Sequence, residues 1–303
     1  MGNKMGINSR RRKQSVSSRK VSRPSPGSSF SLEEPQASEY SKDKRVDDIQ
    51  QFYNHMRHLW QGCFSAHVEE SLIRGSLVLD IGCGTGNWLK EMATEYKYSE
   101  FIGVDILPLP DDVNRLKNIN FVQSDALEFL PFENNYFDYV RISNMSMCFP
   151  ENEWGKLLNE MARVLKPGGY VEIEEPDLEL YNRGPIADYL MSYFLESYAQ
   201  YGINVKLYKR LELYLASTNQ FTGVEWDHKT LSFSSLIDLT GVSLSEIMSY
   251  YFAGNLDLTS QLAGRMAVEE RELKSMYNQM QNEMKSYDSK LHYYRFWGRK
   301  ISM

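Results

Sequence analysis

Apolar and polar positions alternate in two distinct ways along the chain after about residue 45. Short apolar runs that end in an acid, at residues 78–80 and 101–105, are typical of buried parallel strands. Between them, apolar residues recur every three or four positions, as on one face of a helix. This stripe consists of Trp88, Leu89, Met92, Ala93 and Tyr96. The pattern therefore predicts a strand, a helix and a second strand, which together form a βαβ unit.

The same alternation continues towards the C-terminus and predicts an α/β fold. Further strands are expected at residues 119–123, within 130–140, and at 170–175, 224–233 and 292–298. Helices are expected at residues 46–73, 154–165, 186–201, 207–215 and 273–287. About 60 residues separate the last two strands, which predicts a helical insertion, and Ser243 with Glu246 fits a capping box there.

A glycine loop joins the first predicted strand to its helix. Residues 78–88 read Val-Leu-Asp-Ile-Gly-Cys-Gly-Thr-Gly-Asn-Trp. Alternate glycines let backbone approach a ligand, and a helix start offers unpaired N–H groups, so we expect a nucleotide-like ligand here. The dinucleotide fingerprint requires a small residue where this chain has Asn87, and no Gly-Lys-Ser/Thr follows for a P-loop. Asp80, near the end of the strand, is placed to receive a cationic group.

Asp105 follows Gly86 by 19 residues and ends the second predicted strand. At this distance a carboxylate can accept hydrogen bonds from the hydroxyls of a ribose. The alternative is a solvated acid at a strand end.

Charge is distributed unevenly along the chain. The first 30 residues contain eight Lys and Arg residues and no acid, whereas the remainder has a net charge of −14. Residues 1–44 are rich in Ser and Arg and poor in large apolar side chains, which predicts a disordered basic tail. The basic cluster at residues 10–13 is either a localisation signal or a nonspecific basic segment.

Cysteine spacing and hydropathy exclude several classes of protein. Cys63, Cys83 and Cys148 have neither a disulfide-framework nor a metal-ligand pattern, so we expect no metal site and a reducing compartment, cytoplasmic or nuclear. Because no apolar run approaches the roughly 20 residues of a membrane span, we expect none.

Three stretches of the chain resemble class I S-adenosylmethionine-dependent methyltransferases. Residues 80–86 resemble motif I of that family. Residues 130–140, with Leu-Pro-Phe and Phe-Asp-Tyr-Val, and residues 163–170, Arg-Val-Leu-Lys-Pro-Gly-Gly-Tyr, resemble its later segments. Residues 174–179, Glu-Glu-Pro-Asp-Leu-Glu, and residues 294–300, Tyr-Arg-Phe-Trp-Gly-Arg-Lys, are most similar to fungal TAM-domain (Umta-type) methyltransferases.

The resemblance implies a seven-stranded Rossmann-like sheet with helices on both faces, one antiparallel edge strand and a helical insertion before the last strand. The methyltransferase domain would span residues 45–303, with its core at 72–177. Helical elements that cap the substrate would lie at 178–220 and 236–290.

The implied cofactor is S-adenosyl-L-methionine, bound at the carboxyl ends of the strands. Its sulfonium and ammonium groups suit an acidic pocket. Asp125 is expected to contact the adenine amino group. The implied cofactor-binding residues are Asp80, Gly82, Cys83, Gly84, Thr85, Gly86, Asp105, Ile106, Ser124, Asp125 and Ala126.

Methyl transfer from a sulfonium is a direct displacement, so the protein chiefly aligns the reactants and excludes water. A hydroxyl or protonated amine acceptor also requires a general base. The candidates, at the exit of the fifth strand, are Glu174, Glu175, Asp177 and Tyr181. Strand-end acids also cap helices or bind loop amides. Arg141 and Asn144, expected just past the fourth strand, are candidates for holding a polar substrate group, and Arg141 is equally a candidate surface charge.

These features predict a methyltransferase that acts on an oxygen or nitrogen of a small molecule. Two alternatives remain open: a cofactor-binding regulatory protein with little or no turnover, with a protein partner at the basic tail, and a protein methyltransferase. Nucleic acid is disfavoured, because the acidic folded part would repel phosphates.

Overall fold

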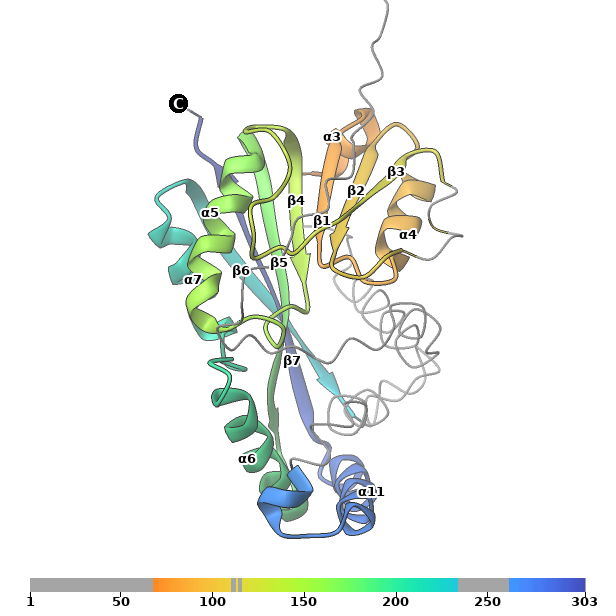
Figure 1. Ribbon diagram of the computed structural model, residues 1–303, viewed down its shortest axis with the longest axis vertical. Helices are drawn as coiled ribbons and strands as arrows, with labels where there is room; N and C mark the ends of the chain where they lie inside the picture. Colours follow the sequence, from red (N-terminus) through yellow and green to blue (C-terminus); the bar gives the residue numbers. More distant parts are fainter. Residues whose placement is uncertain (1–67, 110–112, 114–115, 234–261, 303) are drawn as a thin grey trace, which may run out of the picture. The chain divides into compact units, whose positions relative to one another are not determined.

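A computed structural model of the chain describes residues 68–109, 113, 116–233 and 262–302. Seven strands form one sheet in the order β3-β2-β1-β4-β5-β7-β6 (Figure 1). The strands are β1 (Leu77–Ile81), β2 (Glu100–Asp105), β3 (Ile119–Gln123), β4 (Phe137–Ser143), β5 (Leu165–Tyr181), β6 (Phe221–Ser232) and β7 (Lys290–Lys300). The helices are α3 (Glu69–Arg74), α4 (Asn87–Glu95), α5 (Trp154–Val164), α6 (Pro185–Ala199), α7 (Tyr208–Ser217) and α11 (Glu270–Ser286), with a 3-10 turn η2 (Glu151–Glu153).

The seven-stranded α/β sheet confirms the predicted fold class, but the antiparallel strand is not at the edge. Strands β1 to β5 pair in parallel, and β7 is antiparallel to both of its neighbours, β5 and β6. Tyr293 and Phe296, on opposite faces of β7, are both buried, as a central strand requires. Edge strand β6 instead carries Trp226, which is 46% exposed.

Strand β5 is longer than the predicted segment at residues 170–175. It begins at Leu165, directly after α5, and the predicted turn at residues 166–169 becomes an irregularity in its pairing with β4. At its other end β5 continues to Tyr181 because it pairs with β7. Residues 176–181, expected after the strand, therefore lie within it.

Helices cover both faces of the sheet, as predicted. Helices α5 and α7 pack on one face, where Leu158 and Leu211 share a core with Val140 and Ile173. Helix α4 packs on the opposite face, and the Trp88 ring meets the edge of Phe101 at a centroid distance of 6.1 Å. Because strand side chains alternate, strands β1, β2 and β4 contribute buried residues to both cores.

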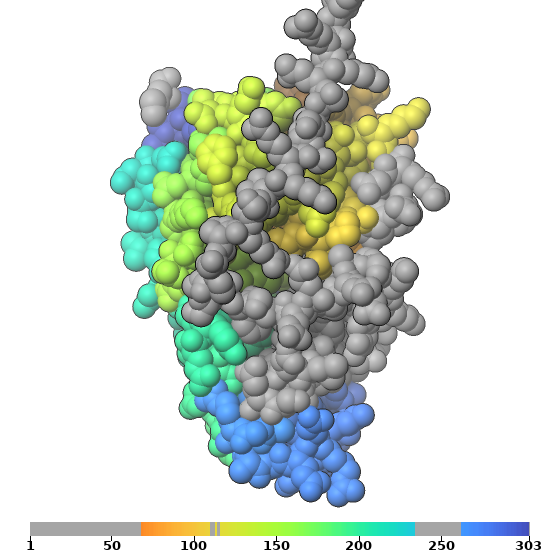
Figure 2. Space-filling view, viewed as in Figure 1, coloured from red at the N-terminus to blue at the C-terminus, as the bar shows by residue number. Residues whose placement is uncertain are grey.

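Helices α6 and α11 pack against each other beside the ends of β5 and β7, in the lower part of Figures 1 and 2. Their shared core includes Phe194 of α6 and Met280 of α11. A carboxylate oxygen of Glu283 in α11 also accepts a hydrogen bond from the Ala187 amide in α6, at 2.9 Å. The two predicted cap segments are thus joined through these helices.

Several predictions lie outside the described residues. These are the tail at 1–44, most of the helix at 46–73, of which only α3 is described, and residues 236–261 with their capping box. Within the described part of the chain, none of the helices is both long and apolar enough to cross a bilayer.

Gly103 in β2 faces the junction between α4 and the glycine loop. A Cβ added there would lie 2.6 Å from Leu89 Cδ1 and 2.7 Å from Cys83 Sγ. We expect Gly103→Ala to lower the free energy of unfolding by about 1–3 kcal/mol, because the methyl group overpacks a closed core. Urea denaturation would measure this. Gly155→Ala in α5, where a Cβ meets nothing within 4 Å, should instead be neutral or stabilising, and similar losses in both variants would contradict the packing argument.

Candidate functional site

The glycine loop leaves β1 and is tied to β2. Gly82, Gly84 and Gly86 have φ values of 69°, 55° and 75°, which only glycine adopts readily. The Gly82 and Cys83 amides both donate to the Val104 carbonyl, at 2.8 and 3.2 Å. Gly82 also lets the Met145 side chain pack directly against the loop, because a Cβ at this position would lie only 2.5 Å from a side-chain atom of Met145. The sequence thus folds into a tight turn whose backbone lies at the carboxyl ends of β1 and β2.

Asp105, the last residue of β2, lies against this loop. Its Oδ2 accepts a hydrogen bond from the Gly84 amide at 2.8 Å, and its Oδ1 accepts one from the Leu107 amide at 2.9 Å. Burial raises the pKa of Asp105, whereas these amide hydrogen bonds oppose that rise. The neighbouring Ile106 is 61% exposed. Two segments that the sequence predicted to share a ligand therefore contact each other.

The segment after β3 joins the same edge of the sheet. The Ser124 amide donates to the Asp105 carbonyl at 3.0 Å. Asp125 Oδ1 accepts from the Leu127 amide at 2.9 Å, which closes a local turn, and Ala126 is buried. The contact of Asp125 with adenine stays a prediction. Of the remaining loop residues, Cys83 and Thr85 are buried.

Arg141 lies inside β4 and is 8% exposed, so its predicted place just past the strand is wrong, and the alternative of a surface charge is excluded. Its Nη1 donates to Asp80 Oδ1 at 2.9 Å. Burial raises the pKa of Asp80 to about 6 in spite of the guanidinium beside it. The cationic group beside Asp80 is thus supplied by the protein itself, and the contact of Asp80 with a cofactor stays a prediction.

The ion pairs continue across the sheet to β7. Arg141 Nη2 donates to Glu174 Oε2 at 2.5 Å, and Arg295 Nη2 donates to Glu174 Oε1 at 2.9 Å. Burial alone would raise the pKa of Glu174, but Arg141 and Arg295 outweigh it and hold the pKa at about 2. A carboxylate with both oxygens paired and so low a pKa is a poor proton acceptor, which disfavours Glu174 as a base.

Glu175 fastens the loop that follows β4. Its Oε1 accepts from the Met145 amide at 2.8 Å, and its Oε2 accepts from the Ser146 amide at 3.1 Å. Burial raises the pKa of Glu175 to about 7. Because both oxygens accept hydrogen bonds from backbone amides, the carboxylate stabilises the loop and is poorly placed to accept a proton from a substrate.

Stability should depend on pH through Glu175. Its folded-state pKa of about 7 lies above the ordinary 4.5, so folding favours its protonated form; the stabilisation is complete below pH 4.5 and is lost as pH rises through 7. We expect Glu175→Gln to remove this loss, on the order of 3 kcal/mol between pH 4.5 and 8. Urea denaturation at several pH values would measure it. Glu160→Gln should leave the slope between pH 4.5 and 8 unchanged, because Arg163 lowers the pKa of Glu160 and this carboxyl therefore titrates below that range. Parallel curves of stability against pH for wild type and Glu175→Gln would contradict the assignment of the slope to Glu175.

Asp177 and Tyr181 lie on the face of β5 opposite to Glu174. Asp177 pairs with His292 across the β5–β7 ladder, and its Oδ2 accepts from the Tyr181 hydroxyl at 2.8 Å. Its Oδ1 accepts from the Glu179 amide at 2.7 Å. Burial raises the pKa of Asp177. The four base candidates therefore do not converge on one point of the site, and each of the three acids is occupied by structural contacts.

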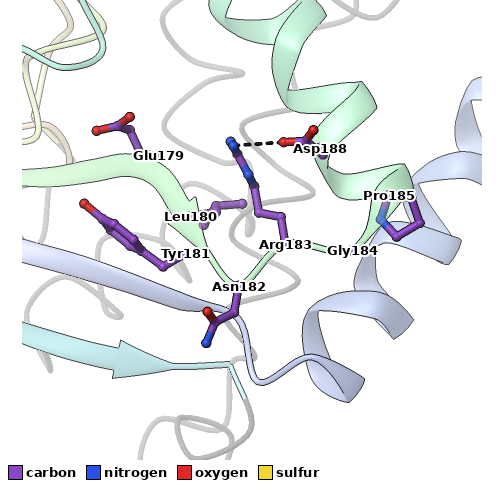
Figure 3. Close-up of a pocket in the computed structure, with 8 residues that line it drawn as sticks. All are labelled: Glu179, Leu180, Tyr181, Asn182, Arg183, Gly184, Pro185 and Asp188. Atoms are coloured by element: carbon purple, nitrogen blue, oxygen red, sulfur yellow. Dashed lines mark ion pairs between the residues drawn. The ribbon is translucent and has the colours of Figure 1, made fainter.

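An open pocket of about 480 Å³ lies at the end of β5 (Figure 3). Tyr181 and Asn182 project from the strand end, and Arg183 reaches towards Asp188 of α6, with which it forms an ion pair at 2.9 Å. Of the candidate site residues, only Tyr181 lines this pocket, and none of the candidate cofactor residues does.

Sequence reasoning missed Arg295 and Tyr293 of β7. The Tyr293 hydroxyl donates to Asn144 Oδ1 at 3.1 Å and lies 3.3 Å from Ser143 Oγ, so β7 reaches the end of β4. An arginine at an inward position of an aromatic, alternating strand was the signal available, because a buried charge requires a partner. Within the described residues, no group of three or more His, Cys, Asp or Glu side chains could hold a metal ion.

Residues 78–169 match the family model described as "Methyltransferase domain". The secondary metabolism regulator laeA of Coprinopsis cinerea is 36% identical over 104 residues, which cover 34% of this chain and 25% of that protein. Demethylmenaquinone methyltransferase of Staphylococcus carnosus is 36% identical over 120 residues, which cover 37% of this chain and 48% of that enzyme. The chain thus spans less than half the length of these curated relatives.

Phosphoethanolamine N-methyltransferase 2 of Haemonchus contortus, in complex with S-adenosyl-L-methionine, superposes with a TM-score of 0.48 and 18% identity, covering 88% of this chain and 60% of that one.

Proposed function

Because this chain carries a class I S-adenosylmethionine-dependent methyltransferase domain, we propose that it transfers a methyl group by direct displacement to an oxygen or nitrogen of a small molecule. The observation that carries the proposal is the contact between Gly84 and Asp105 at the carboxyl ends of β1 and β2. It brings a backbone loop and a carboxylate together where doubly wound sheets bind nucleotides.

The residues of this edge fit S-adenosylmethionine, which would supply an activated methyl group on its sulfonium. The Asp105 carboxylate accepts hydrogen bonds from the Gly84 and Leu107 amides and is also stabilised by the Ile106 amide; because a carboxylate has about four lone-pair sites, a ribose hydroxyl can still be accepted. At Gly82 and Gly86 the place of a Cβ atom is taken by Met145 and Leu109, so the left-handed glycines chiefly allow the tight turn itself. Asp125 and Ala126 would contact the adenine, with Ser124 beside them.

The acceptor class follows from the charges that are already paired. Arg141 is bound by two carboxylates, so it does not serve a carboxylate group of the acceptor. Glu174, Glu175 and Asp177 are each held by hydrogen bonds within the fold. We therefore favour an acceptor that has no anionic group for Arg141 to bind. We also favour one that needs no strong carboxylate base to remove its proton, such as a neutral amine. Positioning and exclusion of water then supply the catalysis.

A second candidate function is a cofactor-binding regulatory protein with little or no turnover. It is favoured by the similarity to a secondary metabolism regulator and by the occupied base candidates. In either case we propose that the domain extends over residues 45–303, that segments 178–220 and 236–290 cap the substrate, and that the basic tail serves a protein partner or a cytoplasmic or nuclear address.

The test follows methyl-labelled S-adenosylmethionine in purified protein mixed with fractionated cell extract. Label that enters the small-molecule fraction, and does so only with wild type and not with Asp105→Ala, would support the enzyme. Label in protein would favour a protein methyltransferase. Binding of S-adenosylhomocysteine without transfer would favour the regulatory function, and absence of binding would refute both.

A further inference from the structure

One buried arginine contacts both ends of the glycine loop. Arg141 donates to Asp80 on β1, just before the loop. Its guanidinium carbon also lies 4.5 Å from the centre of the Trp88 ring, in the first turn of α4 and just after the loop. The loop at residues 82–86 therefore lies between two groups that the same side chain holds.

Arg141 is in turn held from the C-terminal strand. Arg295 donates to Glu174 Oε1 through Nε and Nη2, at 3.1 and 2.9 Å, and the other Glu174 oxygen accepts from Arg141. Arg295 Nε also lies 3.3 Å from Glu172 Oε1. Asp80, Arg141, Glu174 and Arg295 form a chain of alternating charge across β1, β4, β5 and β7, and all four are buried.

Stability alone does not explain such a chain. Removing charges from water costs free energy that their mutual attraction only offsets with good geometry, and apolar side chains of similar volume are often as stabilising. The chain nevertheless ends at the glycine loop, at the edge of the sheet where ligands bind. Its position relative to that loop is the feature that a purely apolar core would not reproduce.

We propose that Arg141 is a positioning residue that orients the glycine loop for S-adenosylmethionine, and that Arg295 sets cofactor affinity through it. This inference rests on the proposed function. Neither arginine needs to touch the cofactor, because a loop fixed in its binding conformation loses less entropy on binding. If Arg295 releases Glu174, Arg141 moves towards that carboxylate and away from Asp80, and the loop is held less firmly.

Arg295→Lys tests the proposal, because lysine keeps the charge but loses the two-pronged contact with Glu174. We expect S-adenosylhomocysteine, measured by calorimetry on folded protein, to bind about tenfold more weakly. Arg299→Lys is the matched control. Arg299 lies on the same strand, but it is exposed and its Nε donates to the Gly168 carbonyl at 2.9 Å. Its replacement should leave the affinity unchanged.

The pH profile separates positioning from general stability. Asp80 is faced by Arg141 on β4, Glu174 on β5 and Asp105 on β2. If Arg141 turns away from Asp80, the pKa of Asp80 rises, so the midpoint of S-adenosylhomocysteine affinity against pH should move upwards in Arg295→Lys. A residue that only stabilises the fold would not move this midpoint.

Trp88→Phe provides a second variant should Arg295→Lys not fold. The smaller ring weakens the contact with Arg141 and should lower affinity several-fold, whereas Trp154→Phe, in α5 on the other face, should not. Unchanged affinity in Arg295→Lys, or equal losses in Arg295→Lys and Arg299→Lys, would overturn the inference alone. A wild type that does not bind S-adenosylhomocysteine would refute the proposed function and the inference together.

Discussion

Arg141→Met is expected to lower the free energy of unfolding by about 3–5 kcal/mol at pH 7, because it leaves buried Asp80 without a cation and buried Glu174 with one cation instead of two. Methionine has a similar length, so the loss reflects charge more than volume. Urea denaturation followed by circular dichroism would measure it.

The loss should shrink as the pH falls. Without the guanidinium, burial raises the pKa of both acids, and their protonated forms carry no unpaired charge. Stability lost at pH 7 is therefore partly regained near pH 5. Arg163→Met is the matched control, because Arg163 pairs with Glu160 where both side chains still reach solvent, and we expect it to cost no more than about 2 kcal/mol. Equal losses in the two variants, or a loss independent of pH, would contradict this account.

The sequence predicted those parts of the fold that depend on local pattern. The βαβ unit around the glycine loop, and helices α4, α6, α7 and α11, follow from apolar spacing that a single segment contains. The length of β5 could not be predicted in this way. Its extension to Tyr181 depends on pairing with β7, more than 100 residues away, which no local pattern specifies.

The same distinction, between local pattern and contacts with distant segments, applies to the candidate site. Spacing alone placed Asp105 opposite the loop, and the structure brings the two into contact. The base candidates were chosen by their position near a strand end, but the partners of Glu174 come from β4 and β7, and those of Glu175 from the loop after β4. Only Asp177 is held by residues of its own strand, Glu179 and Tyr181. Arg141 was misplaced because a charge inside a buried strand is uncommon unless partners distant in sequence compensate it.

Asp105→Ala is expected to weaken S-adenosylhomocysteine binding by about 100-fold. A ribose hydroxyl would lose a charged acceptor, and a hydrogen bond to a charged group contributes about 1.5–3 kcal/mol, which is roughly a 10- to 150-fold change in affinity. Stability should change little, because two effects oppose each other. The variant removes the acceptor of the Gly84 hydrogen bond, but it also removes a buried carboxylate, whose pKa is raised by burial. Isothermal calorimetry and thermal unfolding of the same samples would measure both quantities.

Asp138→Ala is the matched control for this prediction. Asp138, near the start of β4, also accepts a backbone hydrogen bond, from the Leu77 amide at the start of β1, at 2.9 Å. It therefore lies at the amino ends of these strands, whereas Asp105 lies at the carboxyl end of β2. Replacement of Asp138 should leave the affinity unchanged. If Asp105→Ala binds as tightly as wild type, the ribose assignment is wrong. If both variants lose affinity equally, the loss comes from the sheet as a whole, whereas a loss confined to Asp105→Ala places the ribose at the end of β2.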